Sequence, residues 1–277
     1  MSSFRFSRQG DIEYLEALPL AECDFLVHAF LTRQGGVSRG CFAGLNFSSR
    51  EGDQPEDVAA NWRLLADAFQ LDLPQFVLMQ QVHGDRIIAI AADASEIIGS
   101  SSRLPEAVYV CDALVTDRPG IAIGVKTADC APLFLVDRVK RVIGAVHAGW
   151  RGTALNIVGQ AVDVLVDRFG SQPGNILAVI GPAIGPCCYE VDTTVYQALN
   201  VYAAGGGSPC FRPGGHPGKW MLDLALVNRR QLEERDVPAG NIFSGPYCTS
   251  CRSDVFFSHR RERGHTGRHF NFLMLKV

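Results

Sequence analysis

The sequence predicts a mixed α/β or α+β fold in which helices cover a central system of β-sheets. Two observations support this prediction. Some segments carry apolar residues at helical spacing, whereas others are short apolar runs that end at polar or glycine-rich turns. The chain has 277 residues, 47% of them apolar, and no internal repeat or low-complexity tract, so it can bury a large core.

Helices and strands are expected along most of the chain. Helical periodicity predicts two helices, marked by Val58, Trp62, Leu65 and Phe69 and by Ile157, Ala161, Val164 and Leu165. Further helices are expected near 191–202 and 222–235, and the glycines and prolines from Ala203 to Lys219 predict a long surface loop. Strands are expected at RIIAIA (86–91), DALVTD (112–117), IAIGVKTADCAPLFLVD (121–137), RVIGAVHA (141–148), NILAVIG (175–181) and HFNFLMLKV (269–277).

Composition and charge limit the possible partners. The formal net charge is −3 with both signs scattered, so the basic surface of a general nucleic-acid binder is missing. No apolar run approaches the roughly 20 residues that cross a bilayer, and MSSFRFSRQG lacks the apolar middle of a signal peptide. We therefore expect a cytoplasmic protein with no membrane partner. Its nine cysteines are an odd number, which favours reduced thiols that can act as ligands or nucleophiles.

Three strand-like segments each deliver a metal-competent side chain to a turn. They are QQVHGD with His83, KTADCAP with Cys130 and AVHAGWRG with His147. Two imidazoles and one thiolate suit Zn²⁺ and leave one tetrahedral position open, as in catalytic zinc sites. The spacing is not a short metal motif, so two other interpretations stay open: His147 is a hydrogen-bonded core residue, or Cys130 and His147 form the thiolate–imidazole pair of a cysteine hydrolase.

Residues beside these three side chains fit a tightly built site. Gly84 and Gly149 permit close approach of the backbone, and Asp85 and Asp129 are candidates to orient the ligands. Ordinary turn chemistry explains both aspartates equally well. Trp150 is a candidate wall or stacking face for an aromatic base, with core packing as the alternative.

Several motifs, in order, resemble one known family. HAFLTRQGGVS, GLNFS, QQVHGD, TADCAP, AVHAGWRGT, IGPAIGPCCYEV and CTSCRSDVFFSHRRERGHTGR are similar to the YfiH/laccase-domain family, also labelled polyphenol oxidase or purine nucleoside phosphorylase. The similarity runs from about His28 to the C-terminus. It implies a single domain over residues 1–277, with helices outside a β-sandwich-like two-sheet core in α/β/β/α layers. It also implies a zinc ion held by His83, Cys130 and His147.

The resemblance further implies an activity. Members of the family are associated with phosphorolysis of adenosine, inosine, guanosine and methylthioadenosine, and with deamination of adenosine. Nucleoside and phosphate are then the expected partners of what we expect to be a monomer. The alternatives are phenol oxidation by a copper-loaded site, a Cys/His hydrolase acting on an amide or peptidoglycan-precursor substrate, and a binding module without turnover.

Candidate substrate-binding residues follow from the needs of phosphorolysis. The reaction requires cations for phosphate, and guanidinium groups match tetrahedral anions, so Arg33, Arg260 and Arg261 are candidates. Arg151 follows the HAGW turn at the start of an expected helix and is another candidate anion ligand. Asn46 is a candidate contact to ribose or base, although an Asx turn explains it as well.

The remaining cysteine pairs are interpreted as structural. Cys187 and Cys188 are adjacent, and neighbouring side chains of an extended strand point apart, so we expect them to pack or turn. Cys248 and Cys251 have the spacing of a zinc or redox pair, but a structural zinc requires a second pair. The nearest candidates are one cysteine and one histidine in the loop from 203 to 219, so we expect a turn here.

The oxidase and deaminase labels can be checked against the sequence. Multicopper oxidases build their trinuclear cluster mainly from His-x-His pairs, and none of the seven histidines forms such a pair. A four-copper laccase is therefore excluded, although Cu²⁺ can compete with Zn²⁺ for a mononuclear site. The cytidine-deaminase signature of H-x-E with P-C-x-x-C is also missing, so any deamination requires a different arrangement.

Overall fold

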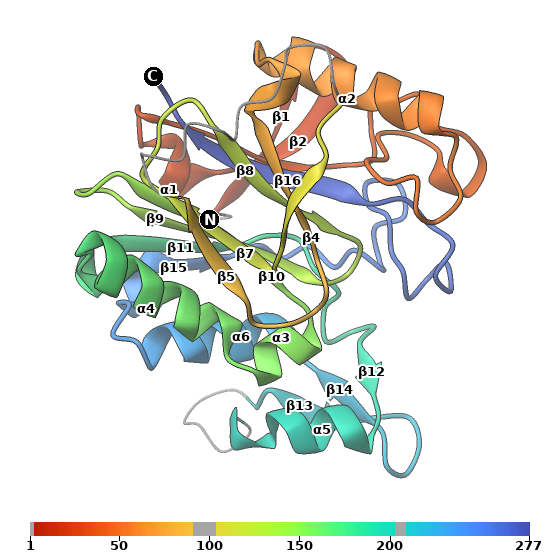
Figure 1. Ribbon diagram of the computed structural model, residues 1–277. Helices are drawn as coiled ribbons and strands as arrows, with labels where there is room; N and C mark the ends of the chain where they lie inside the picture. Colours follow the sequence, from red (N-terminus) through yellow and green to blue (C-terminus); the bar gives the residue numbers. More distant parts are fainter. Residues whose placement is uncertain (1–2, 91–103, 203–208) are drawn as a thin grey trace.

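Two β-sheets face each other at the centre of the protein, with helices outside them (Figure 1). The computed structural model describes residues 3–90, 104–202 and 209–277. The first sheet has seven strands, in the spatial order β1 (Phe4–Gln9), β2 (Ile12–Ala17), β3 (Leu26–Leu31), β16 (His269–Leu275), β8 (Ala122–Thr127), β4 (Phe76–Gln80) and β6 (Ala107–Val110).

The second sheet is the more deeply buried of the two. It has six strands, in the spatial order β15 (Ile242–Ser244), β11 (Ile176–Ile180), β9 (Ala131–Asp137), β10 (Val142–Ala148), β7 (Ala113–Thr116) and β5 (Ile87–Ile90). Every residue of β7, β9, β10 and β11 is buried. A small third sheet contains β12 (Glu190–Val191), β14 (Trp220–Leu222) and β13 (Phe211–Pro213).

Apolar side chains from both sheets fill the space between them. Ile123 and Leu273 of the first sheet share a buried cluster with Leu114 and Val179 of the second. Phe30 on β3 stacks on Phe134 on β9, with ring centroids 4.2 Å apart. The alternating apolar residues of each strand therefore meet across a sandwich, which is how sheets bury one face.

Helices cover the two outer faces. Helix α2 (Pro55–Phe69) packs on the first sheet, where Trp62 lies 4.8 Å from the Phe270 ring. Helices α4 (Ile157–Phe169) and α6 (Leu224–Glu233) pack on the second sheet. Shorter helices are α1 (Leu18–Ala21), α3 (Trp150–Ala154) and α5 (Thr193–Leu199). The predicted α/β/β/α layering is confirmed. No helix among the described residues is long and apolar enough to span a bilayer.

The structure corrects two parts of the predicted element order. The run 121–137 contains two strands, β8 and β9, which belong to different sheets. The predicted loop 203–219 contains β13, which pairs with β14, while 203–208 lie outside the described residues. The N-terminal strands β1 to β3 and strand β4 were not predicted from the sequence.

Two of the connections between the sheets position the site. β4 and β8 run parallel in the first sheet, and each is followed by a strand of the second sheet, β5 and β9. His83 and Cys130 lie on these two crossings. His147 lies near the end of β10, where it pairs with Pro132 at the start of β9. Side chains 83, 130 and 147 are therefore brought to the same edge of the sandwich.

Candidate active site

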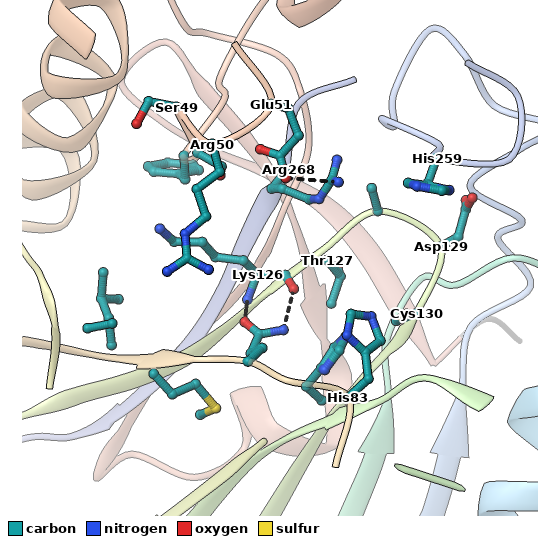
Figure 2. A pocket seen from close by; sticks show the side chains of 18 of the residues that line it. Ser49, Arg50, Glu51, His83, Lys126, Thr127, Asp129, Cys130, His259 and Arg268 are labelled. Carbon is teal, nitrogen blue, oxygen red and sulfur yellow. Dashed lines mark hydrogen bonds and ion pairs between the residues drawn. The ribbon is translucent and has the colours of Figure 1, made fainter. Parts of the chain in front are cut away.

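His83, Cys130 and His147 form a compact cluster at this edge. Their donor atoms all lie within 4.8 Å of one another, and the two imidazole rings are edge to face with centroids 4.8 Å apart. Figure 2 shows His83 and Cys130 together at one side of the pocket. Two ring nitrogens and one sulfur at this separation fit a single Zn²⁺ or a similar ion, and three protein donors leave a tetrahedral position open.

The backbone around the cluster is adapted to this close approach. His83 has a φ of 59° and Asp129, just before Cys130, has a φ of 87°, both in the left-handed region that few side chains adopt. A Cβ atom at Gly149 would lie 3.0 Å from the Cys130 sulfur and 3.2 Å from the His83 ring. Glycine at 149 therefore lets α3 begin directly against two of the three donors.

Asp112 connects two of the three donors and was not singled out in the sequence. Its buried carboxylate accepts a hydrogen bond from Nδ1 of His147 at 2.8 Å. It also accepts the backbone N–H groups of Val82, His83 and Gly84, at 3.2, 3.0 and 2.7 Å. The carboxylate thereby fixes the imidazole tautomer that presents Nε2 to a metal, and it holds the loop that carries His83.

Charge in the cluster favours the metal-binding form of the thiol. Burial opposes ionisation of Cys130, but the charge of His147 and hydrogen bonds from His147 and His83 lower its pKa to about 6. Burial also opposes the charge on His147, but Cys130 and then Asp112 raise its pKa to about 9. Without a metal, the two shifts favour a thiolate–imidazolium pair. A metal binds such a site by displacing the imidazolium proton.

The cluster opens into a cavity of about 800 Å³, which is large enough for a small organic molecule. Its lining combines aromatic surface with positive charge. The aromatic residues are Phe47, Trp62, Trp150 and Tyr189, and the cationic residues are Arg50, Lys126, Arg151, Arg260 and Arg268.

A group of cations that the sequence did not indicate also lines this cavity. Figure 2 shows Arg50 and Lys126 next to each other, with Arg268 nearby in an ion pair with Glu51 at 3.0 Å. Burial and then the charge of Arg50 lower the pKa of Lys126 to about 8, against the opposing effect of Glu51. A bound anion would relieve this repulsion. Lys126 stands on β8 directly before the TAD sequence and four residues before Cys130, but only the pairing of the strands places it in the cavity.

Arg151 and Arg260 lie in the cavity lining, as residues that contact substrate would. The guanidinium of Arg151 lies 4.5 Å from the centre of the Trp150 ring. Arg260 lies 5.2 Å from the centre of the Tyr189 ring and donates to the backbone carbonyl of Glu190. Each of these arginines therefore extends over an aromatic wall of the cavity.

Arg33, Asn46 and Arg261 are placed differently, outside the lining of this cavity. Arg33 donates to the carbonyls of Ala43 and Ser253 and lies over the Phe257 ring. The fully buried Asn46 amide contacts Ser48, Asp53 and the backbone of Arg268. Arg261 donates to the carbonyls of Thr249, Ser250 and Phe256. The polar atoms of these side chains stabilise loops.

The two aspartates considered as orienting groups also differ in position. Asp129 accepts hydrogen bonds from the hydroxyls of Thr249 and Ser258 and from the backbone N–H of Arg260, at 2.6, 3.0 and 2.6 Å. It therefore anchors the turn that carries Cys130. Asp85 lies 3.4 Å from Gln160 instead, on the side of α4.

The structural interpretation of the remaining cysteines requires a correction. Cys187, Cys188, Cys248 and Cys251 form one cluster, with their sulfur atoms within 4.8 Å of one another. The two adjacent cysteines lie in a turn, where their side chains can converge, and not in an extended strand. They supply the second pair of cysteines that a four-thiolate site requires.

Comparison with known proteins decides the family. Residues 27–276 match the family described as multi-copper polyphenol oxidoreductase laccase. The chain belongs to this family. The chain is 39% identical over 247 residues to purine nucleoside phosphorylase YlmD of Geobacillus stearothermophilus, covering 89% of each. It is 34% identical over 268 residues to adenosine deaminase RL5 from an unknown prokaryotic organism, covering 95% of this chain and 99% of that protein.

A solved structure supports the same assignment. The crystal structure of YfiH from Bacillus licheniformis superposes with a TM-score of 0.88 at 36% identity, with both chains covered completely. The resemblance to the YfiH/laccase-domain family seen in the motifs is confirmed. The family description mentions several coppers, but the groups of metal-competent side chains found in the described residues are a three-residue cluster and the four-cysteine cluster.

Proposed function

We propose that this protein is a metal-dependent purine nucleoside phosphorylase with its reaction centre at His83, Cys130 and His147. The observation that carries the proposal is the cavity itself, in which three metal-competent donors share one space with cations and aromatic side chains. The names of the relatives support the same substrate class. Zinc is the proposed metal, because the donor set has two nitrogens and one sulfur, and copper is the alternative.

The reaction transfers the ribosyl group of a nucleoside to phosphate. An oxygen of phosphate bonds to C1′ as the bond from C1′ to the purine nitrogen breaks, and the purine leaves with a proton. Positive charge develops on the sugar, and phosphate has to be held next to it. Arg50 and Lys126 are the proposed phosphate ligands, because both face the cavity with their charges close together.

The rest of the chain positions the purine and the metal. Trp150 and Tyr189 offer flat faces for the base, and Arg151 and Arg260 lie over these faces. A bound metal would supply Lewis-acid polarisation of a substrate atom or water at its open position. Asp112 maintains the tautomer of His147 and the conformation of the His83 loop, so the donor geometry is present before the substrate arrives.

Adenosine deamination is a second proposed activity of the same site. It is favoured by the similarity to adenosine deaminase RL5, which extends over 95% of this chain. Water replaces phosphate as the nucleophile in this reaction and attacks the carbon that bears the amino group, and ammonia leaves. The two reactions require the same purine face but different nucleophile positions.

The experiment that tests the proposal measures product formation from a panel of adenosine, inosine, guanosine and methylthioadenosine, with and without phosphate. We expect free base and ribose 1-phosphate to form only when phosphate is present. Inosine formed from adenosine would indicate deamination. His147→Gln should abolish metal binding and turnover together without unfolding the protein. The matched control His265→Gln changes an exposed histidine outside the cavity lining and should retain both. A His147→Gln protein that keeps its metal and its activity would refute the assignment.

Three further properties belong to the proposal. Residues 1–277 act as a single catalytic domain, the protein works in the cytoplasm as a monomer, and the specificity for purine nucleosides is relaxed. The cavity supports the last point, because its volume of about 800 Å³ exceeds what one nucleoside and phosphate fill. Kinetic constants across the nucleoside panel test the relaxed specificity, and the mass in solution tests the monomeric state.

A further inference from the structure

Four cysteines converge at a second place, where two loops of the second sheet meet. Cys187 and Cys188 lie in the loop after β11, and Cys248 and Cys251 lie in the loop after β15. The Cys251 sulfur is 3.5 Å from the Cys187 sulfur and 3.4 Å from the Cys188 sulfur. All four sulfurs lie within 4.8 Å of one another, although the pairs are about sixty residues apart in sequence.

These separations match the geometry of a metal ion with four thiolate ligands. In a tetrahedral zinc site each Zn–S bond is about 2.3 Å, which places the sulfur atoms about 3.8 Å apart. The sulfurs here lie close to that separation and require small adjustments to surround one ion. Unlike the cluster at His83, this one has four protein donors and leaves no open position, as in structural zinc sites.

The backbone is also arranged around the sulfur atoms. The N–H of Gly185 donates to the Cys248 sulfur at 3.2 Å, the type of hydrogen bond that stabilises a thiolate ligand. A Cβ atom at position 185 would lie 3.2 Å from Cβ of Cys248 and 3.4 Å from the Cys187 sulfur. Glycine is therefore what allows the two loops to close on each other. Ala183 and Cys248 also form an isolated parallel bridge.

A metal is a better explanation of the cluster than cystine formation. All four cysteines are free thiols, and two of them, Cys187 and Cys251, are exposed. Two disulfides would require an oxidant, whereas a zinc ion needs only the loss of the thiol protons. Four thiols gathered without a metal would repel one another on ionisation and gain little from packing at an exposed position.

We propose that Cys187, Cys188, Cys248 and Cys251 bind a structural zinc ion that joins the two loops behind the active site. The loops reach the active site through Asp129, the neighbour of Cys130. The hydroxyl of Thr249 donates to the Asp129 carboxylate at 2.6 Å, and the N–H of Ile184 donates to its backbone carbonyl at 2.9 Å. The ion thus stabilises the wall of the cavity without contacting the substrate.

The test is a count of zinc in variants of the whole protein, purified without added metal. Wild type should contain two zinc ions per chain, and both Cys251→Ser and Cys130→Ala should contain one, because each removes a different site. The matched control is Cys41→Ser, which changes an exposed cysteine outside both clusters and should keep two. One zinc in wild type, retained by Cys251→Ser and lost from Cys130→Ala, would overturn the proposal.

A second measurement keeps the test decisive if Cys251→Ser does not fold. X-ray absorption of zinc in the Cys130→Ala protein should show four sulfur neighbours at about 2.3 Å. Nitrogen neighbours, or no zinc in this variant, would overturn the proposal. So would alkylation of the denatured protein that reaches these four cysteines only after reduction, since this result would identify disulfides.

The proposed effect of the zinc ion on the two loops can be measured separately. Hydrogen exchange of the segments 183–189 and 247–252 should become faster in Cys251→Ser than in Cys41→Ser, because the loops lose their connection. Equal exchange in the two variants would contradict a stabilising role for the ion. None of these measurements depends on nucleoside turnover, so the second metal site and the proposed activity can fail independently.

Discussion

Replacement of Asp112 by asparagine tests how the metal centre is held. The two carboxylate oxygens share four donors: Oδ1 contacts His147 and the N–H of His83, and Oδ2 contacts the N–H groups of Val82 and Gly84. Asparagine keeps one oxygen and turns the other into an NH₂ group. Whichever way the amide is oriented, two of the four donors then face another donor.

The magnitude follows from these contacts. A buried donor that loses its acceptor costs about 1–3 kcal/mol, so two of them lower the free energy of unfolding by about 2–6 kcal/mol. Mutation of a group that orients a metal ligand typically weakens metal binding by about 10–100-fold, which equals about 1.4–2.7 kcal/mol. Asp112→Asn should therefore bind zinc about 10–100-fold more weakly and also unfold more easily.

Two assays separate these effects, and one variant controls for the chemical change. Competition with a chromophoric chelator gives the zinc affinity, and guanidinium titration gives the free energy of unfolding. Asp137→Asn makes the same substitution at the far end of β9, where the buried carboxylate accepts the N–H groups of Val139 and Lys140 through Oδ1 alone. This control should keep wild-type zinc affinity at the site. An Asp112→Asn protein whose zinc affinity is within twofold of the control would refute the positioning role.

Three other perturbations test separate parts of the structure. Lys126→Met should raise the KM for phosphate by about 10–100-fold, because it removes a charged hydrogen bond of about 1.5–3 kcal/mol. An unchanged KM in steady-state assays would show that Lys126 does not bind phosphate. Gly149→Ala places a Cβ atom 3.0 Å from the Cys130 sulfur, so it should weaken zinc binding about tenfold while the protein stays folded. Wild-type zinc affinity in the chelator competition would show that the loop adjusts to the added atom. Burial lowers the pKa of His28 to about 4 and that of His269 to about 3, so both are neutral in the folded protein. Between pH 6.5 and these values the unfolded chain binds more protons, and stability should fall as pH falls, by about 1 kcal/mol for each histidine between pH 6.5 and 5.5. Chemical denaturation at pH 6.5 and 5.5 measures this loss, and equal stability at the two values would contradict neutral burial.

The metal centre illustrates what a sequence can and cannot predict. His83, Cys130 and His147 stand at turns after apolar runs, and thiol and imidazole chemistry is evident from residue type, so the sequence alone pointed to all three. Asp112 was missed because its function depends on a contact 35 residues away, to His147. Nothing in the local pattern distinguishes an aspartate that orients a ligand from one that begins a strand.

The candidate phosphate ligands show that residue type alone does not identify a binding residue. Arg33 and Arg261 carry the right functional group, but in the folded chain their donors bond to backbone carbonyls of neighbouring loops. Lys126 and Arg50 attracted no attention in the sequence, yet they share the cavity with the metal-competent cluster. An arginine is available to a ligand only if the surrounding loops leave its donors unused, and that is decided by tertiary packing.

The sequence by itself indicated a mixed α/β class, the main helices, most strands of the second sheet and the residue types of the metal centre, because periodicity and side-chain chemistry are local properties. Only the tertiary structure decided that the run 121–137 crosses from one sheet to the other and so brings Cys130 to His83 and His147. Only the tertiary structure joined Cys187 and Cys188 to Cys248 and Cys251. Both results depend on strand pairing between distant segments, and the pairing is set by burial of the whole core, which no local pattern encodes.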